Sequence, residues 1–313
     1  MTASYRPKSD RVIDKIRDVF LASGYDESVT ASLVPKVWSD AFSPWSDAPP
    51  LISSQPMLGV LEEYSKNIGS VNLLRRSLVP SLIEVARINE YRSNVDVNLF
   101  ETAKVYLSKG ENEIPDQPTK IGIVSRRDFF SVKGVIEALV SRVNPARQLT
   151  VEPCKFEILD ASQSGELKFD GELLGWIGQV SKSARKKFGL RSDAIVAELD
   201  LAVLEKQAIM IPQHENQSTF PPVSRDFNFV VDNAVRWGDL EATVRTAGGE
   251  LLESIDYRET FRDEKKDGAG KKRLLMSVVL RSATATLSGE EADKVCKSII
   301  SSCESKHSAA LLG

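Results

Sequence analysis

The sequence predicts an α+β protein of two domains, a larger mixed domain over residues 1–212 and a smaller βαββαβ domain over residues 213–313. The chain has 313 residues, of which 42% are hydrophobic, and this length is typical of about two domains that each bury a core. Hydrophobic patterning also gives way to a polar stretch near residues 211–218 and then resumes with a different order of elements. We therefore place the domain boundary in that stretch.

Helices alternate with short strands in the larger domain. Its first helix is expected to start at Ser9, a good N-cap residue, and to end at Gly24, which suits the position after a helix. A second helix begins at Pro80, because proline fits the first helical position, and runs to about Arg92. The other expected elements are strands at 95–106 and 120–125, a helix at 130–143, a hairpin with a strand at 171–180, and a strand running into a turn at 194–204, with 38–50 irregular.

The smaller domain has a regular order of elements. Ser288 and Glu291 form a capping box, which marks the start of its last helix. The other expected elements are strands at 226–231, 251–261, 273–281 and 309–312 and a helix at 237–247. Their order, β-α-β-β-α-β, is that of the ferredoxin-like split βαβ unit.

Composition excludes several classes of protein. With 41 basic and 44 acidic residues the net charge is −3, which argues against a protein that mainly coats nucleic acid or anionic membrane. No stretch approaches the roughly 18 apolar residues of a membrane span, and the N-terminus does not read as a signal peptide. Cys296 and Cys303 lie seven apart on one helical face, too far to pair, and Cys154 is left without an evident partner. We expect reduced thiols, no metal site and a cytoplasmic protein.

Catalytic motifs are missing from the sequence. It contains no dinucleotide-binding glycine motif, phosphate loop, nucleophile elbow or zinc-protease motif. One segment has a local excess of charge, with seven basic and four acidic residues over 258–273. This segment is either a solvated hairpin tip or a finger that faces RNA phosphates, with Tyr257 and Phe261 available to stack on a base.

Several short motifs resemble the β subunit of bacterial phenylalanyl-tRNA synthetases. In the larger domain they are LRRSLVPSL at 74–82, LFE at 99–101 and DFFSVKG at 128–134, and in the smaller domain PVSRDF at 222–227 and TL at 286–287. The sequence departs from the family pattern at Ala285, where the family has arginine, at the loop expected at 159–164, and at the C-terminal residues 311–313, where the family commonly has Leu-Arg. The motifs occur in the family's order, so the resemblance covers nearly the whole chain.

This resemblance implies a fold and a role. The family's β core is a class II synthetase-like antiparallel sheet with helices that has lost its catalytic motifs, and a ferredoxin-fold anticodon-binding domain follows it. The implied role is to scaffold the catalytic α subunit in an (αβ)2 enzyme and to bind tRNA(Phe). Such a chain has no cofactor of its own, because Mg-ATP binds the α subunit. The family's domains upstream of residue 5 are absent, so we expect either a fragment or a short relative.

The resemblance also suggests site residues. Matching back from residues 286–287 assigns Glu259, Phe261 and Arg273 to the first anticodon base. Alternation along a strand puts Glu259 and Phe261 on one face, whereas Arg273 replaces a small hydroxyl residue and contacts phosphate or pairs with Glu259. The alternative is an ordinary exposed Glu–Arg pair beside an aromatic residue. The RNA-backbone candidates are Arg262, Lys271 and Lys272.

A subunit interface is expected on the larger domain. It involves the helix that starts at Pro80 and three residues before it, Arg75, Arg76 and Leu78; the alternative is that these residues only pack the core. Two other functions stay open. One is a stand-alone ligase built on the synthetase-like core, and the other is a regulatory or small-molecule-binding ferredoxin-like module fused to a degenerate core. Whether the chain shows any activity in isolation is left uncertain, and we expect none.

Overall fold

The computed structural model describes residues 6–54, 71–110, 113–211 and 218–312. The chain divides into two compact units, Met1–Pro212 (unit 1) and Gln213–Gly313 (unit 2). Each unit has its own hydrophobic core.

Unit 1 is built on a seven-stranded sheet in the order β1-β4-β5-β9-β8-β7-β6. All neighbouring strands are antiparallel except β1 and β4. The antiparallel core that the family resemblance implies is therefore present. The strands are β1 (Asp26–Glu27), β4 (Asn98–Lys104), β5 (Thr119–Ser125), β6 (Leu149–Pro153), β7 (Leu159–Phe169), β8 (Glu172–Val180) and β9 (Ile195–Asp200).

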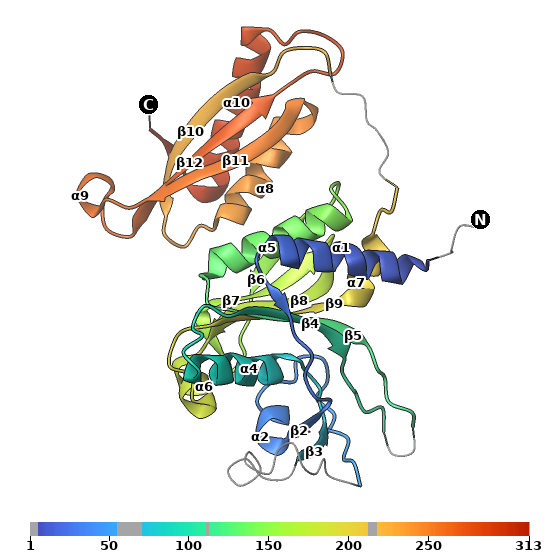
Figure 1. Ribbon diagram of the computed structural model, residues 1–313. Helices are drawn as coiled ribbons and strands as arrows, with labels where there is room; N and C mark the ends of the chain where they lie inside the picture. Colours follow the sequence, from blue (N-terminus) through green and yellow to red (C-terminus); the bar gives the residue numbers. More distant parts are fainter. Residues whose placement is uncertain (1–5, 55–70, 111–112, 212–217, 313) are drawn as a thin grey trace. The chain divides into compact units, whose positions relative to one another are not determined.

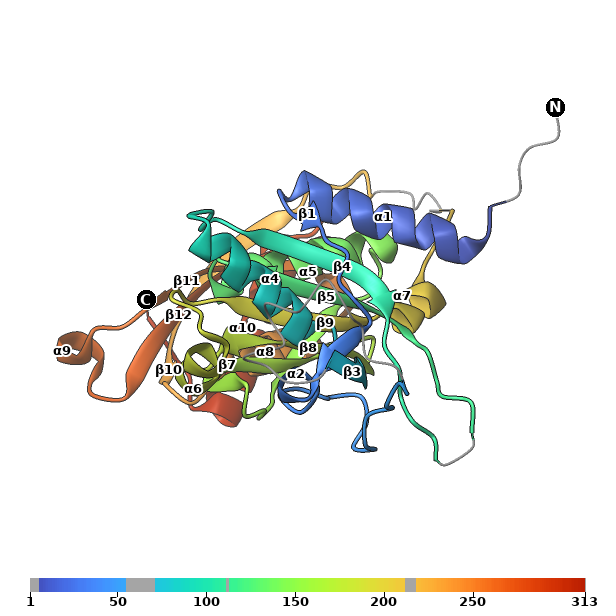
Figure 2. The same cartoon turned by 60° about the horizontal axis from the view of Figure 1, so that its bottom comes forward.

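Helices cover both faces of this sheet, so that it lies between two hydrophobic cores (Figure 1). Figure 2, turned so that the lower side comes forward, shows the helices of that side in front of the strands. One face carries α1 (Lys8–Ala22), α5 (Phe129–Val143) and α7 (Leu201–Gln207), and the other carries α4 (Val79–Tyr91) and α6 (Lys182–Phe188). Beside α4 lie α2 (Lys36–Ser39) and a two-stranded sheet of β2 (Leu33–Pro35) and β3 (Val71–Leu74).

Local chemistry explains where these helices start. The Asp128 side chain accepts the backbone N–H of Ser131 at 3.0 Å and caps α5. Ser9 was expected to cap α1, and this prediction is wrong: α1 starts one residue earlier, after Pro7, and has no side-chain cap. Gly24 does follow the helix, at a φ of +76° that favours glycine.

The structure of unit 1 differs from the sequence prediction in further places. Residues 201–207 form α7 rather than a turn, because Asp200 accepts the backbone N–H of Ala202 and caps a helix there. Residues 159–164 are not a loop but the irregular first half of β7. The elements β1, β2, β3, α2, β6 and α6 were not predicted; the first four have only two to four residues, and such short segments carry no detectable periodicity.

Unit 2 has the predicted βαββαβ order, with its strands in the sheet order β11-β12-β10-β13. Both long helices pack on one face (Figure 1), and we call the opposite face of the sheet the open face. The Ser288–Glu291 capping box is confirmed. The elements are β10 (Val223–Asp232), α8 (Trp237–Gly248), η1 (Gly249–Leu251), β11 (Leu252–Phe261), α9 (Glu264–Asp267), β12 (Lys271–Leu280), α10 (Gly289–His307) and β13 (Ala310–Leu311).

Candidate nucleic-acid interface

The hairpin of β11 and β12 brings the three predicted base-contacting residues onto one face. Phe261 is paired directly with Arg273, and Glu259 with Leu275 two positions along. The intervening Leu274 is buried in the core beneath the helices. Because side chains alternate along a strand, Glu259, Phe261 and Arg273 all lie on the open face. Glu259 is exposed, and Phe261 is 47% exposed.

Arg273 is held by a carboxylate at the hairpin tip. Its Nε and Nη2 each donate to one oxygen of Asp267 at 2.7 Å, and these hydrogen bonds raise the pKa of the guanidinium. The expected pairing with Glu259 is wrong, because the short helix α9 brings Asp267 to Arg273 instead. The guanidinium carbon lies 5.7 Å from the centre of the Phe261 ring. Arg273 therefore lies beside the ring with its guanidinium paired to Asp267.

Tyr257 does not join Phe261 as a second stacking residue. It is paired with Met276, which is fully buried, so it lies on the helix-covered face of the sheet. There its ring packs edge-on against Trp237, with the centroids 5.2 Å apart. Only Phe261 of the two predicted aromatics is on the open face.

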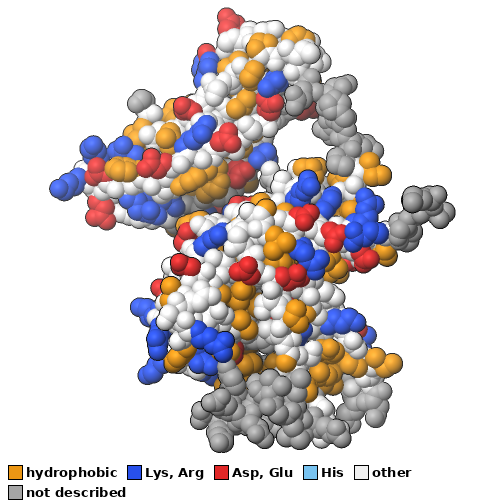
Figure 3. All heavy atoms as spheres, viewed as in Figure 1, with side chains coloured by type: hydrophobic (Ala, Val, Ile, Leu, Met, Phe, Trp, Pro, Cys, Tyr) orange, Lys and Arg blue, Asp and Glu red, His pale blue; other side chains and the backbone are white. Residues whose placement is uncertain are grey.

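The basic residues of the hairpin divide into two groups. Arg262 is exposed and Lys271 is half-buried, and Figure 3 shows Lys and Arg side chains gathered around this hairpin tip. Lys272 is only 8% exposed, and its Nζ donates to the backbone oxygen of Asn233 at 3.0 Å. Burial, together with nearby Arg262, lowers the pKa of Lys272. The contact of Lys272 with an RNA backbone stays a prediction, and this burial does not favour it.

Arg258 is an open-face residue that the sequence analysis did not assign. Its Nε donates to the Ser277 hydroxyl at 2.9 Å, and that hydroxyl donates to Asp226. Simple alternation would put Arg258 and Glu259 on opposite faces, so the pattern gave no signal for it. A register shift between Tyr257 and Glu259 places both Arg258 and Glu259 on the open face.

The predicted subunit-interface residues lie inside unit 1. Leu78 is fully buried directly over Gly122, where an added Cβ would come within 2.7 Å of the Leu78 Cβ. Arg75 is 4% exposed, and its Nη1 donates to Glu101 at 3.0 Å. The expectation that both side chains contact a partner subunit stays a prediction, and their burial instead favours the alternative that they pack the core of unit 1.

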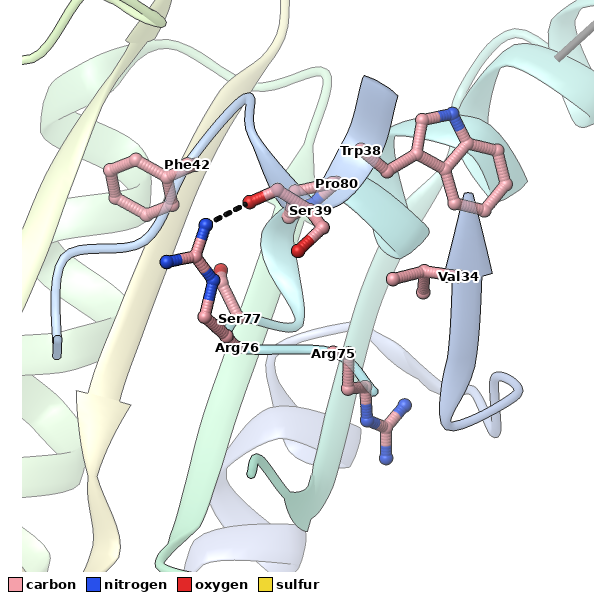
Figure 4. A pocket seen from close by; sticks show the side chains of 8 residues that line it. All are labelled: Val34, Trp38, Ser39, Phe42, Arg75, Arg76, Ser77 and Pro80. Atoms are coloured by element: carbon pink, nitrogen blue, oxygen red, sulfur yellow. Dashed lines mark hydrogen bonds between the residues drawn. The ribbon is translucent and has the colours of Figure 1, made fainter. Parts of the chain in front are cut away.

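Arg76 is also held inside unit 1, by two backbone oxygens. Its Nη2 donates to Ser39 at 2.9 Å, as drawn in Figure 4, and its Nη1 donates to Ala48 at 2.7 Å. Burial lowers the pKa of this guanidinium. Arg76 thus fastens the segment around α2 to the start of α4 and does not point outward as an interface contact.

Other kinds of site find no support in the described part of the chain. Residues 6–54, 71–110, 113–211 and 218–312 hold no group of three or more His, Cys, Asp or Glu side chains that could bind a metal. Within these ranges no helix combines the length and apolarity needed to cross a membrane. The three cysteines are free thiols, and Cys296 and Cys303 are buried on the inner face of α10.

Two family models cover most of the chain. Residues 1–201 match the phenylalanyl tRNA synthetase beta chain CLM domain, and residues 218–312 match the ferredoxin-fold anticodon binding domain. A pyrrolysyl-tRNA synthetase structure from Desulfitobacterium hafniense aligns over 65% of this chain and 70% of that one with a TM-score of 0.47 and 15% identity, which is too low to carry an argument. The family assignment rests on the two models.

Curated relatives agree with the family models. The phenylalanine–tRNA ligase beta subunit of Rhodopirellula baltica is 35% identical over 99% of this chain and 45% of its own length. The corresponding subunit of Bacillus subtilis is 27% identical over 96% of this chain and 37% of its own length. The chain therefore spans less than half the length of these relatives. Together, the antiparallel core, the βαββαβ unit and these matches show that the chain belongs to the phenylalanyl-tRNA synthetase β chain family.

Proposed function

We propose that this chain acts in the cytoplasm as part of a phenylalanine–tRNA ligase β subunit. In this role unit 2 binds the anticodon of tRNA(Phe), and unit 1 scaffolds a catalytic α subunit in an (αβ)2 assembly. The α subunit, rather than this chain, would bind Mg-ATP. The observation that carries the proposal is the open face of unit 2, where an exposed carboxylate, Glu259, lies beside an exposed aromatic ring, Phe261.

The chemistry of this face suits an unstacked RNA base. An exposed aromatic ring on a sheet can stack on a base, and a carboxylate can accept hydrogen bonds from base N–H groups. The Arg273–Asp267 pair lies beside the Phe261 ring and limits its motion. Arg262 and Lys271 lie nearby, where they can contact the phosphates that flank such a base.

Unit 1 supports a scaffolding role because its ionic groups are engaged internally. The fully buried Glu198 accepts the indole N–H of Trp45 at 3.0 Å and two donors at the start of α4. Lys120 pairs with Asp200 at 2.7 Å and lies 3.5 Å from the centre of the Trp45 ring. These contacts hold the segment at Trp45 and the start of α4 against the sheet. We expect no phenylalanine-dependent ATP–pyrophosphate exchange from this chain without an α subunit.

The regulatory alternative is less well supported. A ferredoxin-like unit that binds a small molecule would explain the fold of unit 2, but residues 218–312 match an anticodon-binding domain specifically. A stand-alone ligase would need an ATP site in unit 1, where Glu198, Lys120 and Asp200 are already paired.

Replacing Phe261 by alanine tests the anticodon proposal. In the enzyme assembled with its α subunit, Phe261→Ala should weaken the use of tRNA(Phe), measured as kcat/KM, by about 1–3 kcal/mol, the value of one base–aromatic stack. It should also lower discrimination against tRNA changed at the first anticodon base, because the stack holds that base beside Glu259. ATP–pyrophosphate exchange should stay normal.

Tyr257→Ala is the matched control for this experiment. Tyr257 is 48% exposed, against 47% for Phe261, and lies on the same strand but on the opposite face. It should leave discrimination unchanged. If the wild type and both variants discriminate equally between tRNA(Phe) and the changed tRNA, the open face is not the anticodon site.

A further inference from the structure

Strand β11 contains a bulge at the centre of the open face. Tyr257 is paired with Met276 and Glu259 with Leu275, so Arg258 has no partner of its own on β12. Met276 points into the core, whereas Leu275 lies on the open face. The extra residue therefore lets two consecutive side chains, Arg258 and Glu259, lie on the open face together. Bulges are a common way to re-aim a side chain beside a functional site.

A hydrogen-bond relay fixes the Arg258 side chain on that face. Ser277 is paired with Asp256 on one side and Asp226 on the other. Its hydroxyl donates to Asp226 and therefore presents its oxygen to Arg258, which donates from Nε at 2.9 Å. Among the described residues no hydrogen-bond or ion-pair partner is found for Nη1 and Nη2 of Arg258. The guanidinium is thus anchored at one nitrogen and presents two parallel donors.

We infer that Arg258 reads a guanine base, which rests on the proposed function of this face. Its Nη1 and Nη2 donate to O6 and N7 of the guanine, while Glu259 accepts the N1–H and N2–H groups and Phe261 stacks on the ring. Guanine is the RNA base that offers two adjacent acceptors beside two adjacent donors.

The charges around Arg258 favour a base over a phosphate. Asp226, Asp256 and Glu259 share the open face with Arg258. Three carboxylates around a single free guanidinium repel a phosphodiester, whose contacts depend on net positive charge. A neutral base that carries both donors and acceptors is compatible with this mixture.

The test pairs protein variants with single-atom changes in the base. The assembled enzyme is assayed with tRNA(Phe) that carries guanine, 7-deazaguanine, which lacks N7, or inosine, which lacks the N2 amino group. The wild type should lose about tenfold in kcat/KM with 7-deazaguanine, as expected for one specific base contact. With the guanine tRNA, the kcat/KM of Arg258→Ala should fall by at least this factor relative to the wild type. The variant should show no further loss of kcat/KM with the 7-deazaguanine tRNA, but it should still use the guanine tRNA better than the inosine tRNA.

Two further variants separate reading from other roles. Ser277→Ala should lower discrimination against 7-deazaguanine, but by less than Arg258→Ala does. It removes the hydroxyl that anchors the Arg258 guanidinium and leaves the guanidinium itself in place. Arg262 is an exposed arginine four positions along the same hairpin. Arg262→Ala should lower kcat/KM by the same factor for all three tRNAs.

The outcomes distinguish the inference from the proposed function. If Arg258→Ala discriminates guanine from 7-deazaguanine as well as the wild type does, Arg258 does not read the base. If that occurs while Glu259→Gln still loses discrimination against inosine, the anticodon surface stands and only Arg258 is misassigned. If neither variant alters discrimination, the proposed function fails as well.

Discussion

Arg75→Ala is expected to destabilise unit 1 rather than to weaken a subunit contact. Arg75 donates to Glu101 at 3.0 Å, to the backbone oxygens of Lys104 and Thr30 at 3.0 and 3.2 Å, and to the Thr30 hydroxyl at 2.8 Å. Both ionic side chains are almost fully buried, with 4% and 2% exposed. Removing the guanidinium leaves the Glu101 carboxylate buried without its cation, which costs about 3–5 kcal/mol. This is a large part of the 5–15 kcal/mol that typically stabilises a domain.

Urea unfolding followed by tryptophan fluorescence measures this loss. The double variant Arg75→Ala/Glu101→Ala should lose less than the sum of the two single variants, because it leaves no unpaired charge. Arg142→Ala, an exposed arginine on α5, serves as the control and should change the unfolding free energy by less than about 0.5 kcal/mol. An Arg75→Ala protein with a wild-type midpoint but impaired α-subunit binding would refute this reasoning and restore the interface assignment.

Three other outcomes follow from single side chains. Glu198→Gln should lower the unfolding free energy by about 1–3 kcal/mol, because the amide cannot accept from all three donors. Burial raises the pKa of Glu198, so the unfolding free energy of the wild type should fall as the pH rises from about 4.3 through the folded-state pKa. In urea titrations over this pH range, the difference in unfolding free energy between the wild type and Glu198→Gln should become smaller. Ser288→Ala should cost unit 2 about 1 kcal/mol in the same assay by removing the α10 cap. Burial raises the pKa of Cys303 to about 11, so mass spectrometry after iodoacetamide treatment at pH 8 should show half-buried Cys154 modified well before Cys303.

The sequence predicts a structural feature well where residues close to it in the chain determine it, and poorly where a distant residue does. The elements of unit 2 were predicted closely because each has a local cause, such as the Ser288–Glu291 box. The burial of Arg75 was not, since it depends on Glu101, which is 26 residues away in the chain. Charged residues are seldom buried without a partner, and a partner that folding supplies cannot be found from spacing.

The same contrast holds within the candidate site. Alternation correctly placed Glu259 and Phe261 on one face, since no irregularity separates them. It could not place Arg258, because a bulge depends on pairing with another strand rather than on the strand's own pattern. Nor could it assign Arg273 to Asp267, whose carboxylate is brought back by the turn at α9.

We expect the open face of unit 2 to hold the tRNA anticodon, and hydrogen exchange in the assembled enzyme measures this contact. Amide exchange is compared for the enzyme alone, with tRNA(Phe), and with an acceptor-stem minihelix that lacks the anticodon arm. tRNA(Phe) should slow amide exchange in the β11–β12 hairpin, residues 252–280, and the minihelix should not. Equal protection by both RNAs, or no protection of this hairpin by tRNA(Phe), would contradict this expectation.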